Sequence, residues 1–222
     1  MNIQGAASAL QIALGRHRIP YLLVGRYAIE TACIGGATGP TSDSSAMTLN
    51  VLVDMDKDYI ADVLVSSGEA FGLTSAIGLV FDPDVGYVSA DPIYIDIIES
   101  GEPPYYFPSA AYSPGLRLPI NAIVEVYILH PALLVISTVR LWSVATKDYS
   151  KYGYVEDSRA LLYWLAERKI TIAFEFYEDL PKSYLLMTFA SLYAVQEDIR
   201  GLLELTMNSG DFAAIRDNRI PY

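Results

Sequence analysis

The sequence predicts an α/β fold in which a small mixed β-sheet flanked by helices is followed by a helical C-terminal tail. Strand-like and helix-like segments alternate up to about residue 120, whereas the later segments are mostly helical. Hydrophobic residues make up 52% of the 222 residues and charged residues only 18%, so the chain can bury a substantial core. We therefore expect an α/β core over residues 1–120 and a helical lobe over residues 121–222, packed together as one structural unit.

Hydrophobic spacing predicts the first elements. Apolar residues recur every three or four positions from Ile3 to Leu14, which is typical of an amphipathic helix. Tyr21–Val24 is expected to be a short buried strand, and a second helix is expected from Arg26 to Ile34 after a glycine turn. The next segment, Gly35–Ser45, is rich in Gly, Thr, Ser and Pro, which predicts a loop.

The middle of the chain predicts further strands. Residues alternate between two faces over Thr48–Asp54 and over Ile93–Ile98, which is typical of strands. Between them, Asp56 is placed to cap a helix that runs to Leu64. Weaker strand patterns lie at 77–81 and 86–89.

The remaining segments predict a loop, one strand and several helices. Gly101–Pro114 is rich in proline and tyrosine and is expected to be a loop. Val124–Leu129 is expected to be a strand, and Pro131 occupies the first turn of a mostly apolar helix, the central one of the tail, that ends near Ala145. The other expected helices cover roughly 156–168, 181–195 and 197–207.

Composition excludes several classes of protein. The net charge of −11, with no local cluster of Lys and Arg, argues against binding to nucleic acid. A single cysteine, Cys33, excludes an intramolecular disulfide and a cysteine zinc site, and the two histidines, His17 and His130, are far apart. His17 is expected at the surface and His130 beside a helix cap.

No apolar run is long enough to span a membrane, and the first positive charge, Arg16, follows the N-terminal apolar run. We expect a soluble cytoplasmic protein that uses no metal and no cofactor.

Three motifs in the first half follow in a characteristic order. A strand ends at a glycine before a helix in Leu22–Ala28, a strand beginning with threonine follows at Thr48–Val53, and an acid stands among aliphatic residues in Ile93–Ile98. This order resembles the polymerase-β-like nucleotidyltransferase superfamily, especially its minimal and abortive-infection antitoxin-type members. The tail is similar too, because Val126–Pro131 leads into a helix with Arg140, and Lys147 or Lys151 then precedes Asp157–Leu162.

The resemblance implies a site that this chain has altered. Nucleotidyltransferases hold two divalent cations with three carboxylates, and Mg²⁺ requires oxygen ligands. Asp96 matches the third acid, but Asn50 and Leu52 stand at the first two positions, and Asp54 lies two residues further along. Arg26 is bulky where the family's turn approaches a phosphate. In the tail, Thr138 and Tyr154 replace an expected lysine and acid.

Asp43 is the alternative candidate for the first acid. It lies in the serine-rich segment Thr41–Ser45, without the aliphatic strand that should follow, and Ser45 would fill the second acid position. Canonical nucleotidyl transfer is therefore not expected from either alignment.

The candidate catalytic residues are Asp96, Arg26 and Asn50. Asp96 is either a general base or hydrogen-bond anchor, or a structural relic that caps backbone groups or pairs with an arginine. Arg26 either holds an anionic ligand group or simply pairs with Asp96 or Asp54. Asn50 either binds a ligand carbonyl or is satisfied within the sheet.

A second group of residues is expected to line a pocket for a substrate. The segment Pro103–Pro108 is either a lid over this pocket or a loop packed on the surface. The candidate substrate-binding residues are Tyr27, Leu52, Asp54, Tyr94, Tyr105 and Tyr106.

Three functions are compatible with these features. The first is a repurposed cleft that binds a small, largely apolar molecule and promotes a metal-independent cyclisation or isomerisation. The second is a non-catalytic interaction protein, antitoxin-like or regulatory, whose 17 tyrosines serve an interface. The third is residual nucleotidyl transfer. The expected partner is a small-molecule ligand, neither nucleic acid nor membrane, and self-association into a homo-oligomer is left open.

Overall fold

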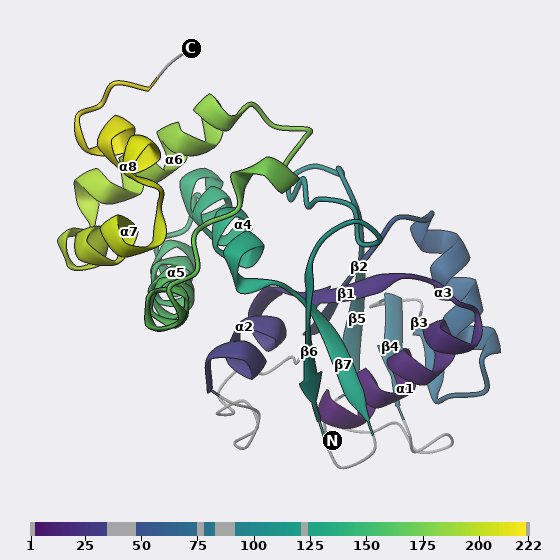
Figure 1. Cartoon of the computed structure of the whole chain (residues 1–222). Coiled ribbons are helices and arrows are strands. Elements are labelled where there is room, and N and C mark those ends of the chain that lie inside the picture. The colour runs from purple at the N-terminus through teal and green to yellow at the C-terminus, as the bar shows by residue number, and fades with distance from the viewer. Residues whose placement is uncertain (1–2, 35–47, 75–77, 83–91, 121–123, 221–222) are drawn as a thin grey trace. The chain divides into compact units, whose positions relative to one another are not determined.

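A computed structural model of the chain describes residues 3–34, 48–74, 78–82, 92–120 and 124–220 (Figure 1). It contains two compact units. The first comprises 1–100 and 109–129, and the second comprises 101–108 and 130–222. The chain thus passes from the first unit to the second at residues 100–101, returns at 108–109, and passes to the second again at 129–130, after the last strand.

The described part of the first unit is built on a seven-stranded mixed sheet. Its strand order is β3-β4-β5-β2-β1-β7-β6. The three central strands are β5, β2 and β1, in which β2 runs parallel to β5 and antiparallel to β1. The strands are β1 (Tyr21–Val24), β2 (Thr48–Val53), β3 (Phe71–Thr74), β4 (Gly78–Phe81), β5 (Ile93–Glu99), β6 (Gly115–Pro119) and β7 (Glu125–Leu129).

Three helices pack against this sheet: α1 (Ile3–Arg16), α2 (Gly25–Ile34) and α3 (Lys57–Ser66). α1 and α3 contact each other as well as the strands, while α2 follows β1 directly and contacts β1 and β2. As predicted, the carboxylate of Asp56 caps α3 and accepts from the backbone N–H of Tyr59 at 3.0 Å. The alternation in β2 buries Leu49, Val51 and Val53 completely, which forms the centre of the core.

The second unit is helical, as predicted. Its central helix is α4, which is buried over its first ten residues and contacts α5, α6 and η1. The helices are α4 (Pro131–Val144), α5 (Asp148–Arg168), η1 (Phe174–Phe176), α6 (Lys182–Val195), η2 (Glu197–Ile199), α7 (Arg200–Thr206) and α8 (Ser209–Arg216).

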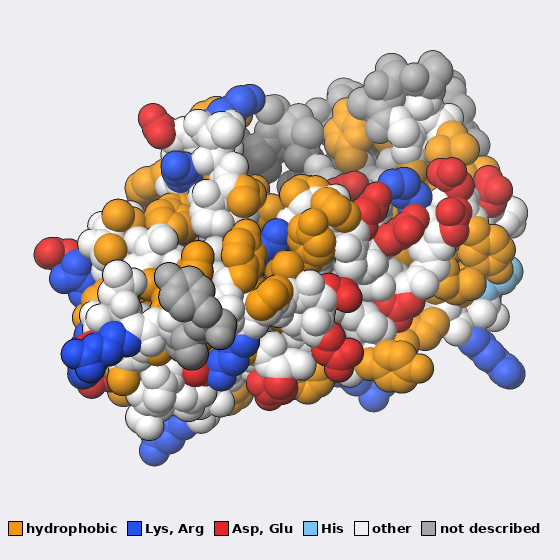
Figure 2. All heavy atoms as spheres, turned by 90° about the horizontal axis from the view of Figure 1, so that it is seen from above, with side chains coloured by type: hydrophobic (Ala, Val, Ile, Leu, Met, Phe, Trp, Pro, Cys, Tyr) orange, Lys and Arg blue, Asp and Glu red, His pale blue; other side chains and the backbone are white. Residues whose placement is uncertain are grey.

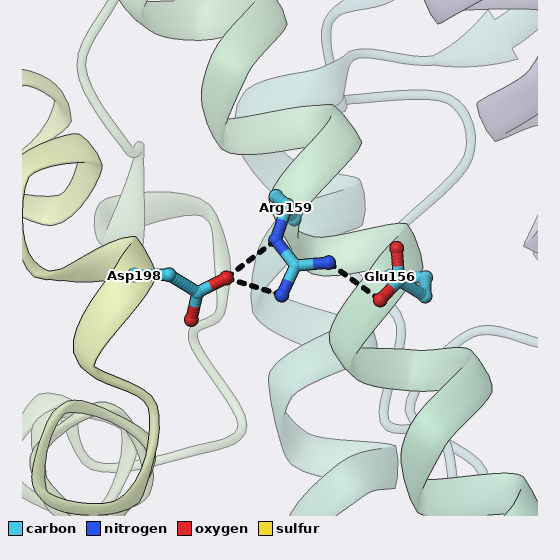
Figure 3. Close-up of polar contacts among 3 residues, drawn as sticks. All are labelled: Glu156, Arg159 and Asp198. Atoms are coloured by element: carbon cyan, nitrogen blue, oxygen red, sulfur yellow. Dashed lines mark hydrogen bonds and ion pairs between the residues drawn. The ribbon is translucent and has the colours of Figure 1, made fainter.

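Ion pairs connect α5 to η2 in this unit (Figure 3). The Nε of Arg159 donates to Asp198 at 2.7 Å, and its Nη1 donates to Glu156 one turn earlier on α5. These side chains are partly exposed, so the pairs contribute little free energy.

The structure corrects several predicted elements. α5 begins at Asp148 instead of residue 156, and β3, β6 and α8 were not predicted at all. The segment expected as one helix over 197–207 is the short η2 followed by α7. The predicted loop at 35–45 and the weak strand at 86–89 lie outside the described residues. None of the described helices is both long and apolar enough to cross a bilayer.

Acidic side chains gather on part of the surface. They include Asp56, Asp58 and Asp62, which are exposed on and just before α3. Figure 2 shows such a group of acidic side chains on the face that it presents. This placement is consistent with the net charge of −11, which repels polyanions.

Candidate functional site

The three central strands bring the motif residues of the first unit into one row. Val24 of β1 is the register partner of Asn50 on β2, and Asn50 is the register partner of Asp96 on β5. Register partners point to the same face of a sheet, so the side chains of Asn50 and Asp96 lie next to each other. The sequence motifs were about 46 residues apart, and the parallel pairing of β2 with β5 unites them.

Asn50 and Asp96 are joined by a direct hydrogen bond. The Nδ2 of Asn50 donates to Oδ2 of Asp96 at 2.8 Å, and both residues are half-buried. The amide is also confined on its other side, because a Cβ at Gly25 would lie 2.7 Å from its Oδ1. Gly25 has a φ of +67°, a conformation that favours glycine. The amide nitrogen is thus turned to Asp96 and the amide oxygen to Gly25.

Leu52 belongs to the hydrophobic core. It is completely buried, and its register partner Ile98 on β5 is 3% exposed. An aliphatic side chain in this place cannot bind a cation, and a carboxylate there would be buried without a partner. The position of the family's second acid is therefore a packing position in this chain.

Asp54 is engaged by the backbone of the first unit. Its carboxylate accepts hydrogen bonds from the hydroxyl of Ser109 at 2.8 Å and from the N–H groups of Ala110 and Ala111, both at 2.7 Å. Partial burial opposes ionisation, but these hydrogen bonds and one from Ser100 outweigh it and lower the pKa of Asp54. The carboxylate thus fastens the segment 109–111 to the end of β2.

Arg26 and Tyr27 follow Gly25 at the start of α2. Arg26 is largely exposed, and its Nε pairs with Glu30 one turn further along, at 2.8 Å. The pairing of Arg26 with Asp96 or Asp54 that the sequence suggested stays a prediction. Tyr27 is 5% exposed, and burial raises the pKa of its hydroxyl.

Tyr94, by contrast, lies on the same sheet face as Asp96. It is half-buried on β5, two residues before Asp96, and its register partner is the exposed Thr48. On this face of β5, Tyr94 and Asp96 are half-buried and Ile98 is buried. Along the strands, this face thus carries first the ring of Tyr94, then the hydrogen-bonded pair of Asn50 and Asp96, and then the aliphatic side chains of Leu52 and Ile98.

Tyr105 and Tyr106 belong to the second unit. The ring of Tyr105 stacks on Phe107 with 5.7 Å between centroids, and the guanidinium of Arg140 lies 4.8 Å from the centroid of Tyr106. Arg140, on α4, is 3% exposed and also donates to the carbonyls of Pro104 and Tyr105. It therefore anchors this segment to the helical unit, a role that its apolar sequence surroundings did not reveal.

The tail positions singled out in the sequence are structural. The hydroxyl of Thr138 is buried and donates to the carbonyl of Leu134 at 2.7 Å, within α4. Tyr154 lies on α5, and partial burial raises the pKa of its hydroxyl. Neither side chain is a cationic or acidic group of the kind that the family places there.

The described residues do not fit a magnesium-nucleotide site. Among the described residues, no three His, Cys, Asp or Glu side chains gather closely enough to hold a metal ion. The alternative acid, Asp43, lies outside the described residues. Beside Asp96 stand an amide donor and a buried leucine, neither of which can replace a carboxylate ligand.

One solved structure matches the chain over nearly its whole length. It is an antigenic nucleotidyltransferase-like protein from Paracoccidioides brasiliensis, with a TM-score of 0.68, 14% sequence identity, and coverage of 98% of this chain and 97% of that one. The chain has a nucleotidyltransferase-like fold. This confirms the fold that the motif order implied, while the antitoxin-type likeness stays a prediction.

Two structures of the antibiotic-resistance factor ANT(2'')-Ia were also found. Their TM-scores are both 0.45, with 14% and 10% identity over 90% and 86% of this chain and 97% of each matched chain. One of them is a complex with adenylyl-2''-tobramycin. No protein-family model matches the chain, and no curated protein matches it.

Within this fold, Asp96 and Asn50 can act together on a neutral polar group. The carboxylate of Asp96 has one oxygen bound to the Asn50 amide and can accept a further hydrogen bond from a ligand. A carboxylate in this state can also take and return a proton. Neither step requires a metal.

Proposed function

We propose that this chain binds a small molecule on the face of the sheet that carries Asn50 and Asp96, and that it does not transfer nucleotides. The hydrogen bond between the two side chains carries the proposal, because it places an amide donor where a nucleotidyltransferase needs its first carboxylate. A hydroxyl or amine of the ligand donates to Asp96, and apolar parts of the ligand lie against the neighbouring side chains such as Tyr94.

A reaction on this face would be one that needs orientation and a single proton-transfer group. In an isomerisation, Asp96 removes a proton from one atom of the ligand and returns it to another, so that no other reactant is consumed. A cyclisation would use the same carboxylate to take a proton from the attacking group and deliver it to the accepting one. Both reactions gain most from holding the ligand in a reactive conformation.

The test compares protein purified from its native source with an Asp96→Asn variant by native mass spectrometry. This substitution removes the charge of Asp96, but its side-chain oxygen can still accept from Asn50, so the fold should be kept. We expect a small molecule bound to the original chain and lost from Asp96→Asn. Asp62→Asn, which removes an exposed acid on α3, should retain it. Equal retention by all three proteins would contradict the proposal.

A second candidate is a non-catalytic interaction protein. Three tyrosines of α5, Tyr149, Tyr152 and Tyr163, are 72%, 70% and 57% exposed and lie on one side of the helix. Exposed tyrosines are common in protein interfaces. Substitution of these tyrosines by serine would abolish such a role, whereas Asp96→Asn would leave it intact, so the two candidates are distinguishable.

A further inference from the structure

A groove of about 490 Å³ lies between α6 and α8 of the second unit. The two helices pack side by side (Figure 1). Part of its lining is apolar or small, namely Leu186, Gly210, Ala213 and Ala214. The rest is polar and comprises Lys182, Ser183, Asp211, Asp217 and Arg219. The absence of long side chains at positions 210, 213 and 214 leaves the space between the helices unfilled.

The two acids in the lining are already neutralised by neighbouring groups. Asp211 is 8% exposed, and its Oδ2 accepts from Nζ of Lys182 at 2.8 Å and from the amide of Asn208. Asp217 pairs with Arg216, whose Nε donates to it at 2.7 Å. These contacts account for both carboxylates and for Lys182.

The guanidinium of Arg219 differs from the other charged groups of the lining in its lack of a close partner within the part of the chain that the structure describes. Among the described residues, no hydrogen bond or ion pair of its side chain is found, although its charge helps to lower the pKa of Asp217, after the larger effect of Arg216. Its backbone is well anchored. Asn218 adopts a left-handed conformation with a φ of +52°, and the N–H of Arg219 donates to the carbonyl of Ala214 at 2.9 Å. This arrangement is a Schellman motif, which fixes where the chain leaves α8.

We propose that this groove binds the carboxylate of a small molecule with a short apolar body. The planar guanidinium of Arg219 matches a carboxylate with two parallel hydrogen bonds, and Leu186 with the alanines of α8 offers a surface for the apolar part. Because Lys182 already pairs with Asp211, Arg219 is the cation of the lining that remains for a ligand, and its single positive charge matches a singly charged carboxylate better than a phosphate dianion. The groove is lined by residues of the second unit, whereas Asp96 belongs to the first.

The test uses sodium octanoate as the probe and the full chain, observed by amide resonances in solution. We expect saturable shifts concentrated in residues 182–186 and 210–219. Arg219→Gln should weaken octanoate binding about tenfold or more, since a charge-assisted hydrogen-bonded pair is lost. Arg16→Gln is the matched control, because it removes the same charge from an exposed arginine of the first unit. It should leave the affinity unchanged.

Several results would overturn the proposal. One is the absence of shifts at millimolar octanoate, and another is equal affinity of the original chain and Arg219→Gln. Octanol binding as tightly as octanoate would show that the carboxylate is not recognised. Inorganic phosphate that competes as strongly as octanoate would assign the groove to another class of anion.

Discussion

Gly25 has no room for a side chain, and this constraint fixes the polar pair of the candidate site. Its φ of +67° costs any other residue about 1–2 kcal/mol, and a Cβ would also meet Oδ1 of Asn50 at 2.7 Å. Relief of this clash would displace the amide that binds Asp96. The glycine therefore keeps Asn50 in the orientation that the site needs.

Gly25→Ala should thus destabilise the chain more than an equivalent change elsewhere. Gly68→Ala is the control, since Gly68 has a φ of +78° but nothing within 4 Å of an added Cβ. We expect Gly68→Ala to lower the free energy of unfolding by about 1 kcal/mol and Gly25→Ala to lower it by at least about 1 kcal/mol more. Urea unfolding measures both values. Equal losses would mean that Asn50 moves aside freely.

Asp54 should make the first unit sensitive to acid. Its pKa is lowered in the folded chain, so its contribution to stability is complete above its ordinary pKa of about 3.9 and is lost as the pH falls through the folded pKa. Asp54→Ala should cost about 1 kcal/mol at neutral pH and remove this acid dependence. Asp62→Ala, an exposed acid on α3, should change neither. Urea titrations at several pH values measure the difference.

At the scale of single elements, α4 begins with an unusual cap. The sequence placed His130 beside the cap, whereas the structure makes it the N-cap itself, with Nδ1 accepting from the N–H of Ala132 at 3.2 Å. Its ring also lies edge-on to Trp164, and burial lowers its pKa. Both the cap and the burial require the neutral imidazole.

Two substitutions separate the contribution of the capping hydrogen bond from that of the titratable imidazole ring. His130→Ala should lower the free energy of unfolding by about 1 kcal/mol at neutral pH, and His130→Asn by less, because asparagine can cap the helix. In the original chain, the contribution of His130 is complete above about pH 6.5 and is lost as the pH falls through the lowered folded pKa. Urea unfolding should show no such loss in His130→Asn. A pH dependence that persists in this variant would assign it to another group.

The elements differed in how well the sequence predicted them. β1, β2, β5 and α4 have long or fully apolar patterns, and their predicted ranges agree with the structure within one or two residues. The missed strands β3 and β6 contain glycine and lie at the two edges of the sheet, where burial on only one side leaves a weak pattern. The first turns of α5 carry exposed tyrosines and charges, so its start was set too late.

At the scale of the whole molecule, the fold was more predictable than the site. The chain shares only 14% of its residues with a structure that it matches over 98% of its length, because a core requires the right pattern of apolar residues more than particular ones. Asn50 and Asp96 were singled out by their places in that pattern, and the structure joins them. The engagement of Asp54 by residues 109–111 and the anchoring of Tyr105 by Arg140 depend on long-range contacts that no local pattern encodes.

Calorimetric titration of the chain with ATP and with GTP, each with and without Mg²⁺, tests the central claim most directly. Because Leu52 is buried and Asn50 is bound to Asp96, we predict only heats of dilution in all four titrations. Saturable, magnesium-dependent binding of either nucleotide at micromolar concentrations would contradict the account.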